Sequence, residues 1–255
     1  MVESPYFLRS SIHRPHKKLK HKKSELHASG YEVFRGAIDI SEKIESLAKK
    51  SADKQASIVF NHNQDNKRND RKRRQCNLPI KTQYMQKFDA AVKDFVKSGV
   101  STDLKPTDPV VLHSRANCQK QAPHCDHIPD VNLKSVSDDY MPLAMVISLM
   151  PETKLRVWPK SARLSMKDPD EFKGMDPIVC QELTLNAGDI VVFRGDFIHA
   201  GSAYEKANYR IHYYLDSPLV PRVAGRTWLI GKHACDELRD LIRPEAKSGL
   251  TLRPA

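Results

Sequence analysis

The sequence contains few cysteines, and they are not arranged as a covalent framework. Five are present among 255 residues, their number is odd, and none forms a CxxC pair. Structural disulfides belong mainly to secreted domains, and CxxC spacing is typical of metal or redox sites. The cysteines therefore argue against a secreted disulfide scaffold and favour a reducing compartment.

Long apolar runs are also missing. The longest, PLAMVISLM at residues 142–150, is much shorter than the roughly 20 residues that cross a bilayer. The opening MVESPYFLRSS lacks the apolar core of a secretory signal. The sequence therefore predicts an intracellular protein, cytoplasmic or nuclear, without a membrane span.

Acidic residues are scarce in two short segments, which carry most of the formal net charge of +11. Residues 1–30 hold seven Lys or Arg against two Glu, and residues 67–74 hold six against one Asp. Rows of like charge without apolar periodicity predict a disordered tail at residues 1–29 and a basic loop. Such runs are solvated, direct nuclear import, or dock on nucleic acid or an acidic partner, here through residues 9–23 and 67–74.

The rest of the sequence predicts one domain over residues 30–255. Its first part, residues 30–108, contains a strand at YEVFRGAID, a helix capped by Ser41 and a short strand at SIVF. A polar loop at residues 61–75 and a second helix at residues 81–99 follow. That helix is expected to turn one apolar face to the core, made of Tyr84, Phe88, Ala91, Val92 and Phe95.

The character of the sequence changes at Pro109. Short β-prone runs such as VVLHSRA, LAMVISL, CQELTL and YRIHYYL fill residues 109–230, separated by Pro, Gly, Asn and Asp. Many short strands with turn signals predict an antiparallel sandwich or barrel. NAGD at residues 186–189 is expected to form a hairpin turn, and residues 231–255 a short helix and a tail. We therefore expect a mainly β fold with flanking helices.

The tetrapeptide HCDH at residues 124–127 is the first candidate for chemistry. Alternate side chains of a strand share a face, so His124 and Asp126 point together while Cys125 points away. A second imidazole from a distant strand completes a 2-His-1-carboxylate site with open positions on iron. The stretch GDIVVFRGDFIH brings His199 back to this region. His127 remains an alternative ligand, a residue behind the ligands, or a solvent-facing one.

Arg210 is the second candidate, because it stands inside an apolar and aromatic strand. By alternation it shares a face with His212 and Tyr214. A buried guanidinium requires an anion. One possibility is an ordinary salt bridge with Asp216 or Glu205. The other is the far carboxylate of a metal-bound five-carbon diacid, 2-oxoglutarate, which a guanidinium matches in two parallel hydrogen bonds.

With these residues the sequence resembles the Fe(II)/2-oxoglutarate-dependent dioxygenases, most closely their phytanoyl-CoA hydroxylase-type branch. The matching pieces are the His-x-Asp pair, the distal histidine, the arginine at the spacing of that branch, and VWPKS at residues 157–161. That last stretch is similar to the proline-glycine-serine-histidine turn of the family. Ala162 and His212 depart from the family pattern, which has histidine and serine or threonine at these places. The likeness covers residues 109–217 and implies a double-stranded β-helix core, also called jelly-roll or cupin-like.

The resemblance also implies roles for single residues. His124, Asp126 and His199 would bind Fe(II), Arg210 would hold 2-oxoglutarate, and O2 would be the oxidant. A substrate would be hydroxylated or oxidatively demethylated, with release of succinate and CO2. Further candidates for contacts with 2-oxoglutarate or for lining the pocket are Asn117, Gln121, His212 and Tyr214, of which the last two are equally compatible with core packing.

Two other functions stay open at this point. One is a non-catalytic cupin-like module that docks on nucleic acid or an acidic partner, and the other is a metal-dependent cupin enzyme that does not use 2-oxoglutarate. Asp216 stands where AlkB-type demethylases carry a second arginine, which speaks against base demethylation but leaves hydroxylation of nucleic acid or protein open. Residues 128–140 and 162–177 are long enough to form a substrate lid.

Overall fold

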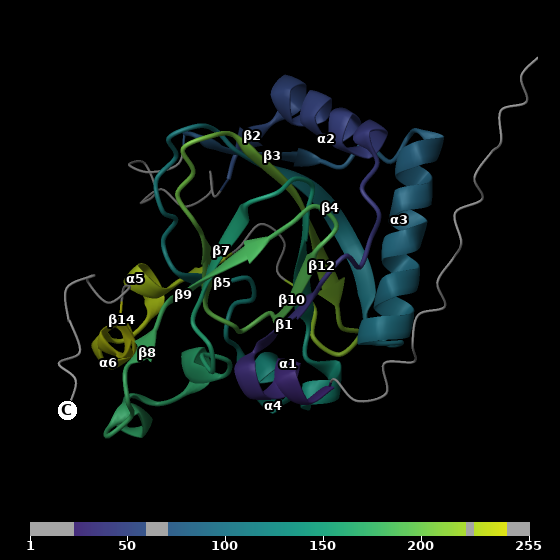
Figure 1. The fold of residues 1–255 in the computed structure, drawn as a ribbon. Helices are drawn as coiled ribbons and strands as arrows, with labels where there is room; N and C mark the ends of the chain where they lie inside the picture. Colours follow the sequence, from purple (N-terminus) through teal and green to yellow (C-terminus); the bar gives the residue numbers. More distant parts are fainter. Residues whose placement is uncertain (1–22, 60–70, 223–226, 244–255) are drawn as a thin grey trace, which may run out of the picture.

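A computed structural model describes residues 23–59, 71–222 and 227–243, and two facing β-sheets dominate it (Figure 1). The larger sheet has seven strands in the order β1-β10-β6-β12-β4-β3-β2, and the smaller has five in the order β13-β5-β11-β7-β9. Neighbouring strands within both sheets are antiparallel. The mainly β, double-stranded β-helix architecture predicted from the sequence is therefore confirmed.

Most strands coincide with β-prone runs of the sequence, but β3 begins within the predicted loop and β4 starts before its predicted run. The larger sheet consists of β1 (Tyr31–Phe34), β10 (Ile190–Arg194), β6 (Leu143–Ser148), β12 (Asn208–Asp216), β4 (Lys105–Ser114), β3 (Arg73–Asn77) and β2 (Ser57–Ile58). The smaller consists of β13 (Trp228–Leu229), β5 (His124–Cys125), β11 (His199–Gly201), β7 (Thr153–Val157) and β9 (Gln181–Leu185). A separate parallel pair joins β8 (Ile178–Val179) to β14 (Ile242–Arg243).

Two helices cover the outer face of the larger sheet. In Figure 1, α2 (Glu42–Gln55) lies across one end of it and α3 (Gln83–Phe95) runs along its side. The Ser41 hydroxyl accepts a hydrogen bond from the backbone N–H of Ile44 at 3.4 Å, so the predicted N-cap is confirmed. Both helices pack on the outward-facing side chains of β12, which include Tyr209, Ile211 and Tyr213.

The remaining helical segments are short and lie at the edges of the sheets. They are α1 (Lys23–Ser29), the wide turn Val96–Val100 after α3, α4 (Val131–Ser135), the 3₁₀ turns Asp138–Tyr140, Leu164–Met166 and Pro169–Phe172, α5 (Ile230–His233) and α6 (Asp236–Leu241). All five cysteines are free thiols. Among the described residues, no helix has both the length and the apolar character needed to span a membrane.

The apolar face of α3 differs from the predicted one. Tyr84 is 55% exposed and Ala91 is also exposed, whereas Met85 is fully buried. The Thr82 hydroxyl caps the helix, and this start sets a phase that turns Met85 and Asp89 inward. Asp89 accepts a hydrogen bond from the Tyr213 hydroxyl at 3.1 Å. A buried phenol needs such an acceptor, so a carboxylate occupies a position that an apolar pattern assigns to a hydrophobic residue.

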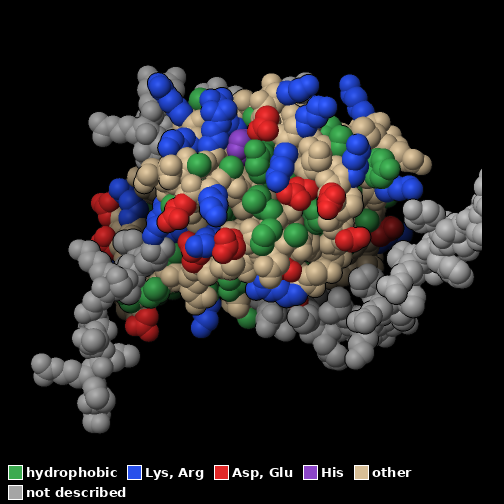
Figure 2. Space-filling view, turned by 45° about the horizontal axis from the view of Figure 1, so that its top comes forward, with side chains coloured by type: hydrophobic (Ala, Val, Ile, Leu, Met, Phe, Trp, Pro, Cys, Tyr) green, Lys and Arg blue, Asp and Glu red, His purple; other side chains and the backbone are tan. Residues whose placement is uncertain are grey.

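Both segments predicted to lack regular structure contain some. Helix α1 occupies residues 23–29, and its Leu26 packs against the core, so disorder up to residue 29 is wrong for this part. The predicted loop at residues 61–75 ends in β3, which pairs with β4. The basic tail at residues 1–22 and the loop at residues 60–70 lie outside the described residues. Lys and Arg side chains gather toward the end of the molecule that carries α2 and β3 (Figure 2).

NAGD forms the predicted turn but not a hairpin. It joins β9 of the smaller sheet to β10 of the larger one, so the chain crosses between sheets at this corner. The Asp189 carboxylate fixes the corner by accepting hydrogen bonds from the backbone N–H groups of Asn186 at 2.9 Å and Gly36 at 2.8 Å. A tight turn alone does not reveal whether its two strands pair with each other.

Gly188 at this corner is the position where a side chain is least tolerated. We expect Gly188→Ala to destabilise the protein by at least about 3 kcal/mol, since left-handed backbone costs roughly 1–2 kcal/mol and a steric clash adds to it. Its φ is +84°, and an added Cβ would lie 2.2 Å from the Ile38 carbonyl oxygen. Gly174→Ala is the matched control, with φ +78° and nothing within 4 Å. Urea unfolding that gives equal losses for both variants would contradict this account of the corner.

Candidate active site

Three predicted ligands lie close together at the paired starts of β5 and β11 in the smaller sheet. His124 begins β5 and His199 begins β11, and the two residues are direct partners in the antiparallel ladder. Asp126 follows β5 immediately. One ligand atom from each residue lies within 4.8 Å of the other two, and all three side chains are buried. The antiparallel register therefore brings together two histidines that are far apart in the sequence.

Backbone carbonyls orient both imidazole rings. The Nδ1 of His124 lies 2.9 Å from the Ala122 oxygen, and the Nδ1 of His199 lies 3.2 Å from the Phe197 oxygen. A carbonyl only accepts, so each Nδ1 carries the hydrogen and each Nε2 carries a lone pair. These Nε2 atoms are 3.9 Å and 3.6 Å from the same Asp126 Oδ1. The lone pairs and the carboxylate oxygen face a common centre.

Burial sets the protonation states of the three groups. It lowers the pKa of His124 to about 3 and also lowers the pKa of His199. Burial alone would raise the pKa of Asp126, but His199 and the hydrogen bond from His212 hold it well below its usual range. At neutral pH the cluster therefore consists of two neutral imidazoles and one carboxylate, which is the state that binds a metal ion.

His212 holds the second oxygen of the carboxylate. Its Nε2 lies 3.0 Å from Asp126 Oδ2, and since a carboxylate only accepts, the ring N–H donates. Oδ2 is thereby occupied while Oδ1 stays directed at the two histidines. This arrangement favours an aspartate that binds a metal through one oxygen and leaves the other coordination positions open.

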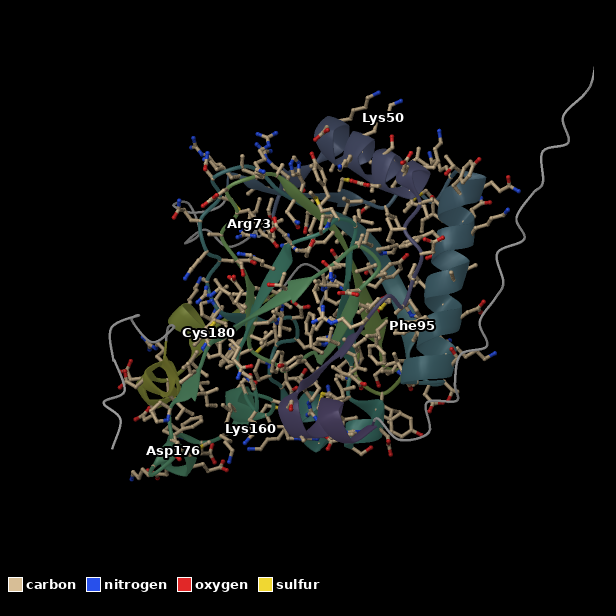
Figure 3. The ribbon with its side chains drawn as sticks, viewed as in Figure 1. Lys50, Arg73, Phe95, Lys160, Asp176 and Cys180 are labelled. Carbon is tan, nitrogen blue, oxygen red and sulfur yellow. The ribbon has the colours of Figure 1, made fainter. Side chains whose placement is uncertain are left out.

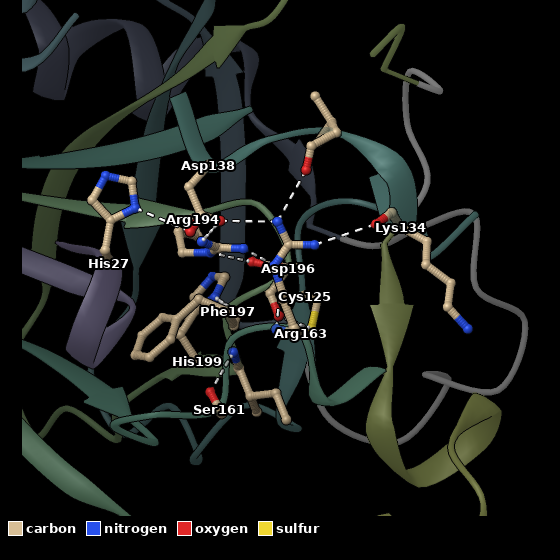
Figure 4. A network of polar contacts seen from close by, with 12 residues as sticks. His27, Cys125, Lys134, Asp138, Ser161, Arg163, Arg194, Asp196, Phe197 and His199 are labelled. Carbon is tan, nitrogen blue, oxygen red and sulfur yellow. Dashed lines mark hydrogen bonds and ion pairs between the residues drawn. The ribbon is translucent and has the colours of Figure 1, made fainter. Parts of the chain in front are cut away.

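A network of polar contacts fixes the turn that precedes His199 (Figure 4). Arg194 at the end of β10 donates to both carboxylate oxygens of Asp196 at 2.9 and 3.0 Å, and to Asp138 at 2.6 Å. The Ser161 hydroxyl accepts a hydrogen bond from the backbone N–H just before His199 at 2.9 Å. This serine belongs to the VWPKS stretch, so its part in the site is to hold the turn.

Arg210 lies in the same cavity as the metal-ligand cluster. The cavity has a volume of about 230 Å³ and is walled by apolar side chains such as Val110, Leu112, Val146 and Leu155. Arg210 is 5% exposed and donates from Nη1 to the Ser114 hydroxyl at 2.9 Å, while its Nε has no partner. No acidic side chain among the described residues pairs with it.

The ordinary salt bridges considered for Arg210 are absent from the part of the chain that the structure describes. Asp216 instead binds Arg222 at 2.9 Å, and Glu205 is exposed on the loop before β12. A buried guanidinium with a free N–H and no counter-charge is costly. This orphaned donor fits a ligand that brings a carboxylate into the cavity.

Arg73 is a cavity residue that sequence reasoning missed. Figure 3 shows it beneath α2 at the end of the barrel, whereas Lys50 points outward. It is 2% exposed and donates to the Ser114 hydroxyl at 3.0 Å, the same oxygen that accepts from Arg210. The two guanidiniums thus flank one hydroxyl, whose own hydrogen remains available to an anion. Its neighbours in the basic run are also charged, so no periodicity in the sequence marks the one that points inward.

The other predicted residues divide into those inside and those outside the cavity. Gln121 and Tyr214 line it, and the Gln121 side-chain oxygen accepts from the Gly201 backbone at 2.9 Å. Asn117 is outside, on an exposed turn with φ 56°, because left-handed backbone directs it away. His127 is 4% exposed rather than solvent-facing, and it is not part of the cluster.

The segments predicted as a lid do not line the cavity. Residues 128–140 and 162–177 contribute none of its walls. Leu133 and Val136 instead pack in a small apolar cluster with Met141, whereas Leu164 and Phe172 belong to the cluster that contains α6. The described mouth is bordered by Val59, Arg74 and Arg222. Length alone predicts a lid, but the apolar residues of these segments pack into two clusters away from the cavity.

The donor set fits a metal ion and its cosubstrate. Two imidazole nitrogens and one carboxylate oxygen form the facial arrangement that binds Fe(II) with positions left open. The free Nε of Arg210 and the Ser114 hydroxyl lie in the same cavity as that cluster. One ligand could chelate the metal ion at one end and accept hydrogen bonds from Arg210 and Ser114 through a distal carboxylate.

Comparisons with known proteins support the fold. No family model and no curated protein matches the sequence. Among solved structures, the non-heme alpha ketoglutarate dependent epimerase SnoN from nogalamycin biosynthesis aligns with a TM-score of 0.55 and 15% identity, covering 76% of this chain and 81% of SnoN. HygX from Streptomyces hygroscopicus, with nickel and 2-oxoglutarate bound, aligns with a TM-score of 0.56 and 10% identity, covering 78% and 89%.

A third structure, the non-heme alpha ketoglutarate dependent carbocyclase SnoK from nogalamycin biosynthesis, aligns with a TM-score of 0.52 and 12% identity, covering 76% of this chain and 82% of SnoK. At such identities the likeness establishes a shared fold. SnoN and SnoK are named as alpha ketoglutarate dependent, and HygX was solved with the same compound, 2-oxoglutarate, bound. The narrower likeness to the phytanoyl-CoA hydroxylase-type branch remains a prediction.

His212→Leu tests whether a hydrogen bond controls the Asp126 ligand. We expect it to weaken Co(II) affinity by about 10- to 100-fold, as is common when a group behind a metal ligand is lost. His212→Gln retains an N–H donor and should recover much of that affinity. Titration calorimetry gives the affinity, and the Co(II) absorption spectrum reports the coordination number. Equal behaviour of both variants and the native protein would show that the contact has no such role.

Stability of the metal-free protein should fall as the pH drops from 7 to 5. His124, His127 and His199 have pKa values lowered by burial from an ordinary 6.5. Below pH 6.5 the unfolded chain takes up protons that the folded chain refuses, so each histidine costs up to about 1.4 kcal/mol per pH unit until the pH reaches its pKa in the folded chain. Urea unfolding at several pH values measures this slope. His199→Gln should reduce it, and a flat profile in the native protein would contradict the assignment.

Proposed function

We propose that this protein is an Fe(II)- and 2-oxoglutarate-dependent oxygenase. The observation that carries the proposal is the presence, in one buried cavity, of the His124, Asp126 and His199 cluster together with Arg210. Solved structures of the same fold include HygX with nickel and 2-oxoglutarate bound. Substrate C–H, O2 and 2-oxoglutarate would give C–OH, succinate and CO2, with one oxygen atom entering each of the first two products.

Each residue has a defined task in this scheme. The Nε2 atoms of His124 and His199 and the Oδ1 of Asp126 would hold Fe(II), which supplies oxygen activation when 2-oxoglutarate is bound. Arg210 and the Ser114 hydroxyl would hold the distal carboxylate of 2-oxoglutarate. The apolar walls keep water from the reacting carbon, which strengthens these charged contacts. The substrate decides whether the hydroxylated product is a stable alcohol or releases its hydroxylated methyl group as formaldehyde.

The alternatives raised by the sequence are less well supported. A non-catalytic module has no use for three buried ligands whose protonation states are already set for a metal. A metal-dependent enzyme without 2-oxoglutarate leaves Arg210 buried without an anion. The cavity thus supports an oxygenase with a dicarboxylic cosubstrate.

The test compares two ligands of equal length on metal-loaded protein. We expect 2-oxoglutarate to bind the native protein about 100-fold more tightly than 2-oxopentanoate, which lacks the distal carboxylate, because charge-assisted hydrogen bonds contribute roughly 1.5–3 kcal/mol each. Arg210→Met should remove this preference while leaving 2-oxopentanoate binding unchanged. Calorimetry with Ni(II) in place of iron measures binding without turnover.

Turnover provides the second readout. Native protein with Fe(II) and ascorbate should release succinate from 2-oxoglutarate, and His199→Ala should not. Equal succinate release by both proteins, or equal binding of the two oxo acids by native protein, would refute the oxygenase.

A further inference from the structure

A group of exposed or partly exposed cations borders the cavity. This cationic rim consists of Arg71, Lys72, Arg74 and Arg115. The backbone N–H of Arg115 bonds to the Lys72 oxygen at 2.8 Å, and Arg74 Nε bonds to the Arg71 oxygen at 3.2 Å, so the four residues are contiguous. Arg74 is itself part of the cavity wall. The rim thus leads directly into the candidate active site.

Among the described residues, the rim cations contact backbone carbonyl oxygens. Lys72 bonds to the Asn117 oxygen at 3.0 Å, and Arg74 bonds to the oxygens of Arg71 and Ala56. Within the described ranges, no Asp or Glu pairs with a rim residue. The nearby Asp53 instead accepts from the Tyr209 hydroxyl and lies 3.6 Å from His113.

Some exposed cations elsewhere on the surface are paired with carboxylates. Examples are Lys93 with Asp89, Lys173 with Asp170, and Arg239 with Asp236. Arg74 in the cavity wall and its three rim neighbours place four positive charges beside the cavity, without a paired carboxylate among the described residues. Clustered charge of one sign beside a low-dielectric cleft attracts a ligand of the opposite sign.

The rim suits a nucleic-acid strand better than a protein partner. Protein interfaces bury apolar anchors at their centres. The large exposed hydrophobic residues are not in the rim segments, and they are Tyr84, Tyr140, Met175, Val179 and Leu219. Four cations also exceed what one isolated phosphate requires, whereas a strand presents a negative charge on every nucleotide.

We infer that the rim binds the phosphates of single-stranded nucleic acid and thereby delivers a base or sugar carbon to the cavity. A single strand is required because the metal-ligand cluster is buried, and a nucleotide within a duplex cannot reach it. This inference rests on the proposed function for its chemistry. The binding step is independent of iron.

The experiment measures fluorescence anisotropy of a labelled 12-nucleotide single-stranded DNA with the full chain in EDTA over a range of salt concentrations. Arg74→Gln combined with Arg115→Gln should weaken binding at least about 10-fold and reduce the slope of log K against log salt by about 1.4, since each phosphate contact contributes ~0.7. Arg71→Glu combined with Arg115→Glu changes only exposed side chains and should weaken binding further.

The matched control is Lys173→Gln combined with Arg239→Gln. It removes two positive charges, as the Arg74→Gln and Arg115→Gln variant does, but from exposed sites outside the rim. Apart from the general effect of the lower net charge, it should bind DNA like the native protein. Equal affinity and salt slope in the rim and control variants would overturn the inference. Displacement of the DNA by poly-glutamate as effective as by unlabelled DNA would also overturn it.

Succinate release separates this inference from the proposed function. The oligonucleotide should stimulate 2-oxoglutarate turnover by native protein and by the control variant, but not by either rim variant. Turnover without rim-dependent DNA binding would remove the nucleic-acid substrate and leave the oxygenase. Rim-dependent binding without any turnover would remove the oxygenase and leave the rim as a nucleic-acid site.

Discussion

The pairing of β5 with β11 is the constraint on which the candidate site depends. It sets His124 directly opposite His199, and the Asp126 carboxylate completes the cluster from the residue just beyond β5. Both rings are held by carbonyl oxygens of their own chain segments, and the turn before His199 is held by Arg194 and its carboxylate partners. The ligands are therefore positioned by the fold before any metal binds, which reduces the cost of ordering them.

The second feature of the cavity is its charge. Asp126 is the carboxylate of the ligand cluster, while Arg73 and Arg210 share the Ser114 hydroxyl, and Arg222 near the mouth is paired with Asp216. Among the described residues, positive charge without a paired carboxylate therefore lies at Arg210 inside the cavity and along the rim. Such a distribution of charge attracts both small and large anions. The positions of the imidazole rings and of the Ser114 hydroxyl decide where each anion binds.

Much of the site follows from the sequence because strand alternation is a strict rule. It correctly separated Arg210, His212 and Tyr214 from the three outward residues of β12, and it placed His124 beside Asp126. The contact of His212 with Asp126 was not predicted, because it depends on how two sheets face each other. Similar reasons explain the errors at NAGD, where strand pairing decides the topology, and at Tyr84, where the cap decides the phase of the helix.

Arg73 shows the limit of composition as evidence. Within a run of charges it has the signature of a solvated loop, and only pairing with β4 turns it into a buried cavity residue. Anomalous diffraction at the iron edge, from a crystal loaded with Fe(II) without oxygen, tests the site most directly. One peak bounded by His124, Asp126 and His199 is expected, and a saturated crystal with no peak there would contradict the proposed centre.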